Sequence, residues 1–129
     1  MTTGYATTLR NAQLDAITAA VGNAGKLQIY DGTRPATGGT ATVKLAEFTL
    51  GSPFAPAASA AALSPTLPAS TTGITAGTAT WFRVTTSAGS FVLDGSAGTG
   101  GTDLVLNTAT LSSGVNVSVS AFGISRGNP

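Results

Sequence analysis

Apolar and polar residues alternate with a period of two along several short stretches, which predicts half-buried β-strands. The strongest run is residues 78–86, TATWFRVTT. Phe82 and Val84 lie on one face of it and are predicted core residues. Trp81 shares the other face with Arg83, so we expect that face to be partly wet.

Glycine and serine separate this strand from the ones that follow. Residues 87–89 predict a turn and residues 90–94 the returning arm of a hairpin. The GSAGTGG stretch at 95–101 predicts a flexible turn. It lacks the lysine of a phosphate-binding loop and precedes a strand-like segment, which excludes that reading. Residues 103–107 and 114–124 form the last predicted pair, with a bulge after Ala121 where the alternation changes phase.

Residues 26–51 predict an antiparallel pair with a long connecting loop, and the rest of the chain is arranged around it. A strand at 26–30, with Leu27 and Ile29 on its buried face, ends at Asp31-Gly32, a dipeptide that favours turns. Pro35 forces the preceding residue into an extended conformation, so the loop should be exposed. The returning strand, 42–50, alternates imperfectly. Either a bulge lies near Ala46 and Glu47 or both faces are covered.

Residues 7–22 carry the helical pattern, with Thr7 or Thr8 as the expected cap and Gly22-Asn23 as the stop. The apolar arc contains Leu9, Leu14, Ile17, Ala20 and Val21, and Asn11, Asp15 and Thr18 lie opposite. This arc packs either on the sheet, which the pattern favours, or on a neighbouring subunit.

Residues 52–77 hold four of the six prolines and predict an extended excursion with one short strand at 60–67. It is either a binding segment or a surface crossover. The chain thus predicts a single domain, 1–129, that is mainly β: an antiparallel β-sandwich, jelly-roll-like, with one N-terminal α-helix at 7–22. Its strands lie in 26–51 and 78–125.

Charge is sparse: 9% of residues are charged, the net charge is +1, and 42% are hydrophobic. The scattered basic residues give no nucleic-acid footprint. No apolar run reaches the length of a membrane span or signal peptide, so we expect a soluble protein made in the cytoplasm. A weakly charged surface suits a protein packed against others.

The chain has no His and no Cys, which removes the commonest base, nucleophile and metal ligands. Five carboxylates remain, and a glycosidase needs two of them facing one cleft. Asp31, Asp94 and Asp103 each lie beside a predicted turn, where they are expected to cap backbone. We therefore expect no enzyme, no cofactor and no metal site.

Two blocks are more specific than the rest: RNAQLDAI at residues 10–17 and LQIYDGTRPA at 27–36. They resemble small virion proteins of tailed bacteriophages. Looser similarity continues through LAEFTL, WFRV and NTATLSSGVNVSVSAF, whereas residues 52–77 do not match. The resemblance implies a capsid decoration (cement) protein, a β-sandwich on the outside of the phage head, made in the bacterial cytoplasm.

The implied partner is the major capsid protein, bound by a dimer or trimer of this chain. Arg34 is the sharpest candidate contact, either pairing with a capsid carboxylate or with Asp31 of its own loop. A tail or head–tail connector component and a sugar-binding adhesion module, the latter through Trp81, are the alternatives. The full set of candidate contact residues is Thr3, Tyr5, Arg10, Thr33, Arg34, Pro35, Phe54 and Pro56.

Overall fold

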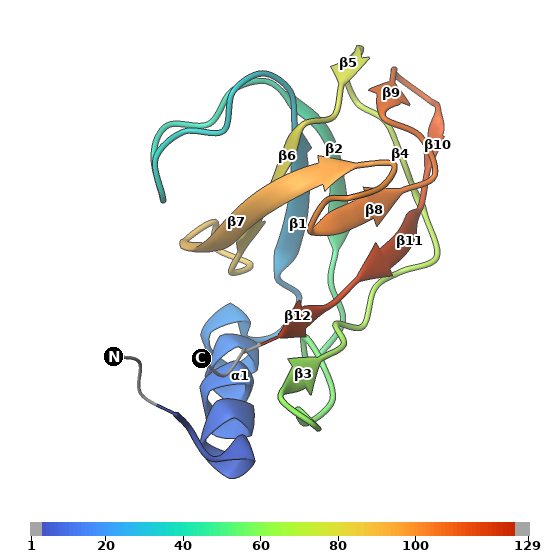
Figure 1. Ribbon diagram of the computed structural model, residues 1–129. Coiled ribbons are helices and arrows are strands. Elements are labelled where there is room, and N and C mark those ends of the chain that lie inside the picture. The colour runs from blue at the N-terminus through green and yellow to red at the C-terminus, as the bar shows by residue number, and fades with distance from the viewer. Residues whose placement is uncertain (1–3, 126–129) are drawn as a thin grey trace.

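The computed structural model describes residues 4–125, and this part of the chain is mainly β with one helix and a curled sheet (Figure 1). Thr3 lies outside the described residues. The helix is α1 (Thr7–Val21). The strands are β1 (Lys26–Tyr30), β2 (Lys44–Thr49), β3 (Ala62–Leu63), β4 (Thr71–Thr72), β5 (Gly77–Thr78), β6 (Trp81–Thr85), β7 (Phe91–Gly98), β8 (Leu104–Leu106), β9 (Thr110–Leu111), β10 (Asn116–Val117), β11 (Val119–Phe122) and β12 (Ile124–Ser125).

A six-stranded sheet forms the body, in the order β11-β8-β7-β6-β1-β2. Every pairing in it is antiparallel except β7 with β8, which is parallel over two residues of each strand. The sheet is thus mostly antiparallel, as expected, with one parallel pairing that was not predicted.

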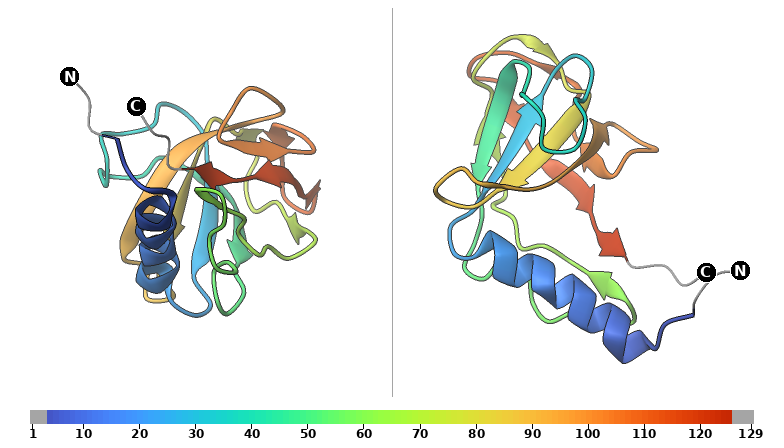
Figure 2. Two further views of the ribbon diagram at one scale, coloured as in Figure 1. Left: turned by 60° about the horizontal axis from the view of Figure 1, so that its bottom comes forward. Right: turned by 90° about the vertical axis from the view of Figure 1, so that its left-hand side faces the viewer.

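The sheet curls because the segment that follows β2 comes back along the free edge of β2. The amide of Ile74 donates to the carbonyl of Leu45, and β4 pairs with β10, which leads directly into β11 at the opposite edge. The two views in Figure 2 show this curvature, with α1 lying across one end of the sheet and away from its centre. The apolar side chains face the inside of the curl.

The core confirms the predicted inward face of the central strands. Leu27 and Ile29 of β1 and Phe82 and Val84 of β6 are all at most 2% exposed. Phe48 of β2 continues the same layer. Burying side chains of this size stabilises the fold by roughly 1.5–3 kcal/mol each.

The expectation of a glycine turn at 95–101 is wrong in its first half, because β7 runs on to Gly98. Gly95 lies opposite Phe82, and a β-carbon there would lie 2.7 Å from the phenylalanine ring. The missing side chain thus makes room for the ring across the strands, and the strand continues. Only residues 99–103 form the loop.

The irregularities in the strands lie close to their predicted places. The β1–β2 register shifts so that Tyr30 pairs with Lys44 while Ile29 pairs with Ala46, which leaves Leu45 as the extra residue. Both Leu45 and Ala46 are buried. In β11 the shift falls at Ser120, just before the predicted position.

Helix α1 has the predicted length and stops at Gly22, whose φ of 70° suits glycine. The predicted threonine cap is wrong, since Ala6 precedes the helix and no side chain caps it. Leu14 and Val21 are buried, but Leu9 of the predicted apolar arc is 46% exposed.

Polar residues of α1 that lie opposite the predicted apolar arc also contact the protein. The Asp15 carboxylate accepts a hydrogen bond from the amide of Ala58 at 2.7 Å. The Asn11 side chain accepts one from Ala61 at 2.9 Å. These bonds anchor the excursion close to β3, which spans only Ala62–Leu63. The predicted strand at 60–67 is therefore much shorter.

Candidate functional site

The connection between β1 and β2, residues 31–43, forms an exposed arm that projects from the body (Figure 1). Its base is closed by reciprocal bonds between the two ends of the arm. The amide of Asp31 donates to the carbonyl of Val43, and the amide of Val43 donates to the Asp31 carboxylate at 3.1 Å. The Thr42 hydroxyl also donates to the Asp31 carbonyl. The arm therefore leaves the sheet from a fixed base.

Trp81 of β6 supports that base from below. Its indole N–H lies 3.0 Å from both the Asp31 carbonyl and the Thr42 hydroxyl oxygen. The ring stacks on Tyr30, with 4.4 Å between centroids. Trp81 is 1% exposed, so the predicted wet face is wrong and a sugar cannot reach this ring. The arm itself excludes the water.

Arg83 holds the far side of the arm. Its guanidinium donates to the Gly39 carbonyl at 2.8 Å and lies about 5 Å from the ring centroids of Trp81 and Phe91. The residue is only 9% exposed. Aromatic faces and a carbonyl oxygen both favour a cation, and together they fix the arginine beneath the arm.

Asp94 of β7 is the counter-charge of Arg83, although the pair is not hydrogen-bonded. Nη2 of Arg83 lies 3.6 Å from Oδ2 of Asp94, and both side chains are nearly buried. Neither Nε of Arg83 nor Oδ2 of Asp94 has a hydrogen-bond partner among the described residues. The attraction is therefore one of charge across a short gap. Asp94 was expected to cap a turn, but it lies within a strand.

The limb of the arm that leads from β1 to the turn at residues 36–39 carries three of the predicted contact residues together. Thr33 and Arg34 are exposed and Pro35 is half-buried. The ion pairs among residues 4–125 are Lys44–Glu47 and Arg83–Asp94, so Arg34 does not pair with Asp31. The Asp31 carboxylate instead bonds the backbone of the arm, as expected of an aspartate beside a turn.

The remaining predicted contacts lie apart from the arm. Tyr5 and Arg10 are half-buried at the start of α1, and Arg10 donates to the Thr7 hydroxyl at 3.1 Å. Pro56 is exposed on the excursion. Phe54 was predicted to contact a partner, and this prediction is wrong. The residue is 0% exposed, so its ring belongs to the core and cannot be reached by a partner.

A polar row crosses the outer face of the sheet next to the arm. Glu47 accepts hydrogen bonds from Gln28 and Lys44, both at 2.9 Å. Burial alone would raise the pKa of Glu47, but these bonds and the lysine charges outweigh it and lower the pKa. Burial raises the pKa of Tyr30, whose hydroxyl donates to Gln28. The row is internally paired.

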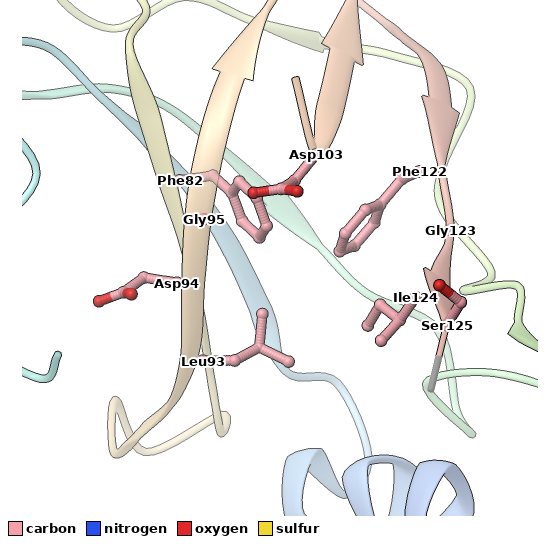
Figure 3. A pocket seen from close by; sticks show the side chains of 9 residues that line it. All are labelled: Phe82, Leu93, Asp94, Gly95, Asp103, Phe122, Gly123, Ile124 and Ser125. Atoms are coloured by element: carbon pink, nitrogen blue, oxygen red, sulfur yellow. The ribbon is translucent and has the colours of Figure 1, made fainter. Parts of the chain in front are cut away.

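A cavity of about 350 Å3 lies on the inner side of the sheet, between β7 and the C-terminal strands (Figure 3). Phe82, Leu93, Phe122 and Ile124 point into it, and Asp103 lies at its rim. No local sequence pattern predicts this cavity, because it forms between strands that are about 30 residues apart in the chain. Asp103 accepts hydrogen bonds from the amide and hydroxyl of Ser96.

Residues 4–125 contain no group of His, Cys, Asp or Glu that could hold a metal ion. Within the same range, no helix is long and apolar enough to cross a membrane. Comparison with known protein families, with curated proteins and with solved structures gives no match.

Proposed function

We propose that this chain is a non-enzymatic structural protein of a phage particle, a decoration protein that binds the outside of the head and bridges major capsid subunits. The observation that carries the proposal is the arm at 31–43, which is exposed at residues 32–34, held at its base by Trp81 and held at Gly39 by Arg83. A fixed, exposed arm loses little conformational freedom on binding.

The resemblance to small virion proteins supports the same function. Its two most specific blocks fall on α1 and on β1 with the first half of the arm. The second block therefore includes Arg34. A decoration protein binds the assembled lattice better than its free subunits, so its binding energy stabilises the shell by mass action.

In this proposal the curled sheet is a jelly-roll-like β-sandwich, and the chain acts as a dimer or trimer in the virion. Arg34 takes a carboxylate of the capsid subunit, in the two-pronged geometry that guanidinium groups favour. Binding through side chains of the arm requires no nucleic acid, membrane or cofactor. The oligomer is checked by light scattering of the purified protein.

The test is binding to heads that lack this protein. We expect wild-type protein to saturate such heads and Arg34→Ala to bind about 30-fold or more weakly, the loss typical of a desolvated interfacial arginine. Lys26→Ala is the matched control, since it removes one positive charge at the end of β1 away from the arm. It should bind like wild type.

Two results would contradict the proposal at different levels. If wild-type protein does not bind heads at any site, the decoration function is wrong. If Arg34→Ala binds as tightly as wild type while remaining folded, the function stands and the arm contact is wrong.

A further inference from the structure

The first half of β7 has a strand partner on one side only. Residues 91–96 pair with β6, and β8 joins the other edge only at Ala97 and Gly98. Within residues 4–125 no other strand pairs with β7. An edge of about five residues, Phe91–Gly95, is therefore open inside an otherwise continuous sheet.

The backbone groups of this edge point into the cavity. The amide of Ala97 donates to Thr80, towards β6, whereas the amide of Ser96 donates away from β6 to Asp103. Amide direction alternates along a strand. The N–H and C=O of Asp94 therefore face the open side, where no strand reaches them.

The opposite wall of the opening is the C-terminal segment of the described chain. Phe122, Gly123, Ile124 and Ser125 line it, and β12 uses its far edge to pair with β3. The Phe82 and Phe122 rings meet edge to face, 5.2 Å apart, and narrow the slot at one end. The result is a slot with a backbone edge on one side and an apolar floor (Figure 3).

Natural proteins protect open edges with proline, lysine or inward-pointing charge. Residues 91–95, FVLDG, contain no proline or basic residue, and the Asp94 side chain points away from the slot towards Arg83. Nothing in the edge itself discourages pairing. An unprotected edge beside an apolar cavity is the arrangement that accepts an added strand.

A segment that pairs with β7 in this slot has to be a single extended strand with no neighbouring strand of its own. Edge-to-edge pairing with β7 of a second copy would bring that copy's sheet against the wall formed by residues 122–125. A single extended segment carries no such bulk. Its alternate side chains would enter the apolar floor, and its amides would suit the Asp103 carboxylate at the rim.

We propose that this slot accepts an extended arm of the partner protein as an additional strand beside β7. The identity of the donor rests on the proposed function, in which the partner is the major capsid protein. The slot is thus a second contact, separate from Arg34, and it recognises backbone and aliphatic side chains rather than charge.

Residue-level hydrogen exchange on the full chain tests this. In free protein the Asp94 amide should exchange rapidly while those of Leu93 and Gly95, which face β6, are protected. On heads we expect protection of Asp94 to rise about 100-fold, the difference between an open and a paired amide. Unchanged exchange at Asp94 in head-bound protein overturns the slot and leaves the decoration function intact.

A variant that fills the slot gives the matching binding test. Ile124→Trp places a ring in the cavity and should weaken head binding at least about tenfold. Gly100→Trp, the control, adds the same ring at a loop glycine with open space around it and should bind normally. If Ile124→Trp fails to fold, Ile124→Lys replaces it. Wild-type binding by a folded slot variant overturns the proposal.

If wild-type protein does not bind heads, the decoration function fails and the slot is tested alone. The probe is a short peptide of alternating valine and threonine, present at millimolar concentration. Protection of Asp94 by this peptide, lost when the peptide amides facing β7 are methylated, supports a strand site. No protection, or equal binding of the methylated peptide, overturns it in favour of an ordinary apolar pocket.

Discussion

Replacing Arg83 by methionine removes the charge that holds the arm while keeping most of the apolar stem. The variant loses the charged hydrogen bond to Gly39, worth roughly 1.5–3 kcal/mol, and the contacts with Trp81 and Phe91, worth about 0.5–1 kcal/mol each. It also leaves the Asp94 carboxylate nearly buried without a counter-charge.

Removing one partner of a buried pair typically costs about 3–5 kcal/mol. The separation of 3.6 Å and the absence of a hydrogen bond place this pair at the lower end, so we expect about 3 kcal/mol. For a domain of this size that lowers the melting temperature by roughly 10–15 °C. Scanning calorimetry measures both quantities.

Two further variants separate the charge from general damage. Arg83→Met combined with Asp94→Leu removes both charges and should recover much of the loss, because no unpaired carboxylate remains. Arg34→Ala, an exposed arginine on the same arm, should change stability by less than about 0.5 kcal/mol. A loss below about 1 kcal/mol for Arg83→Met, or no recovery in the double variant, would refute the account of the arm.

Three other predictions concern stability. Gly95→Ala should cost about 1–3 kcal/mol in urea unfolding, since its β-carbon would lie 2.7 Å from the Phe82 ring, and an unaffected midpoint would contradict the packing argument. Ala60 and Ala61 have φ of 51° and 58°, a backbone region that Asn and Gly adopt more easily than Ala. The double variant Ala60→Asn with Ala61→Gly should therefore be more stable by about 1 kcal/mol and melt at a higher temperature. A lower melting temperature would exclude strain at these two residues. Glu47 has a lowered pKa, so its contribution, at most about 1 kcal/mol, is present above the ordinary value of 4.5 and is lost as pH falls through the folded value. Glu47→Gln should therefore be less stable than wild type at pH 7 and equal to it in acid, and a constant difference from neutral to acid pH would be inconsistent with this.

The alternation of apolar and polar residues predicted the central strands, because the burial of each strand face is determined by neighbours that lie only a few ångströms away. The pattern in β1 and β6 identified Leu27, Ile29, Phe82 and Val84 as core, and all are buried. The end of α1 at Gly22 was also predicted correctly, because the end of a helix depends on the backbone preference of the residue at that position.

The errors arise where a distant segment decides the role of a residue. Gly95 resembles a turn residue, but the Phe82 ring across the strands is what requires it. Asn11 and Asp15 look like solvent-facing helix positions, yet they bond a segment more than 40 residues away. Arg83 looked partly wet because nothing local reveals that the arm folds over it. The slot beside β7 was not predicted, because it arises where the first half of β7 lacks a neighbouring strand on one side, and the local sequence does not show which strands become neighbours.

Trp81 is the only tryptophan of the chain, and it lies stacked on Tyr30 under the base of the arm. Its excited state is therefore sensitive to the two oxygen atoms that its N–H contacts, both of which belong to the arm. Any ligand that tightens or lifts the arm alters the emission wavelength and the near-ultraviolet dichroism of this one pair of rings. The protein thus carries an intrinsic optical probe at its proposed contact, and binding there can be followed in real time on unlabelled material.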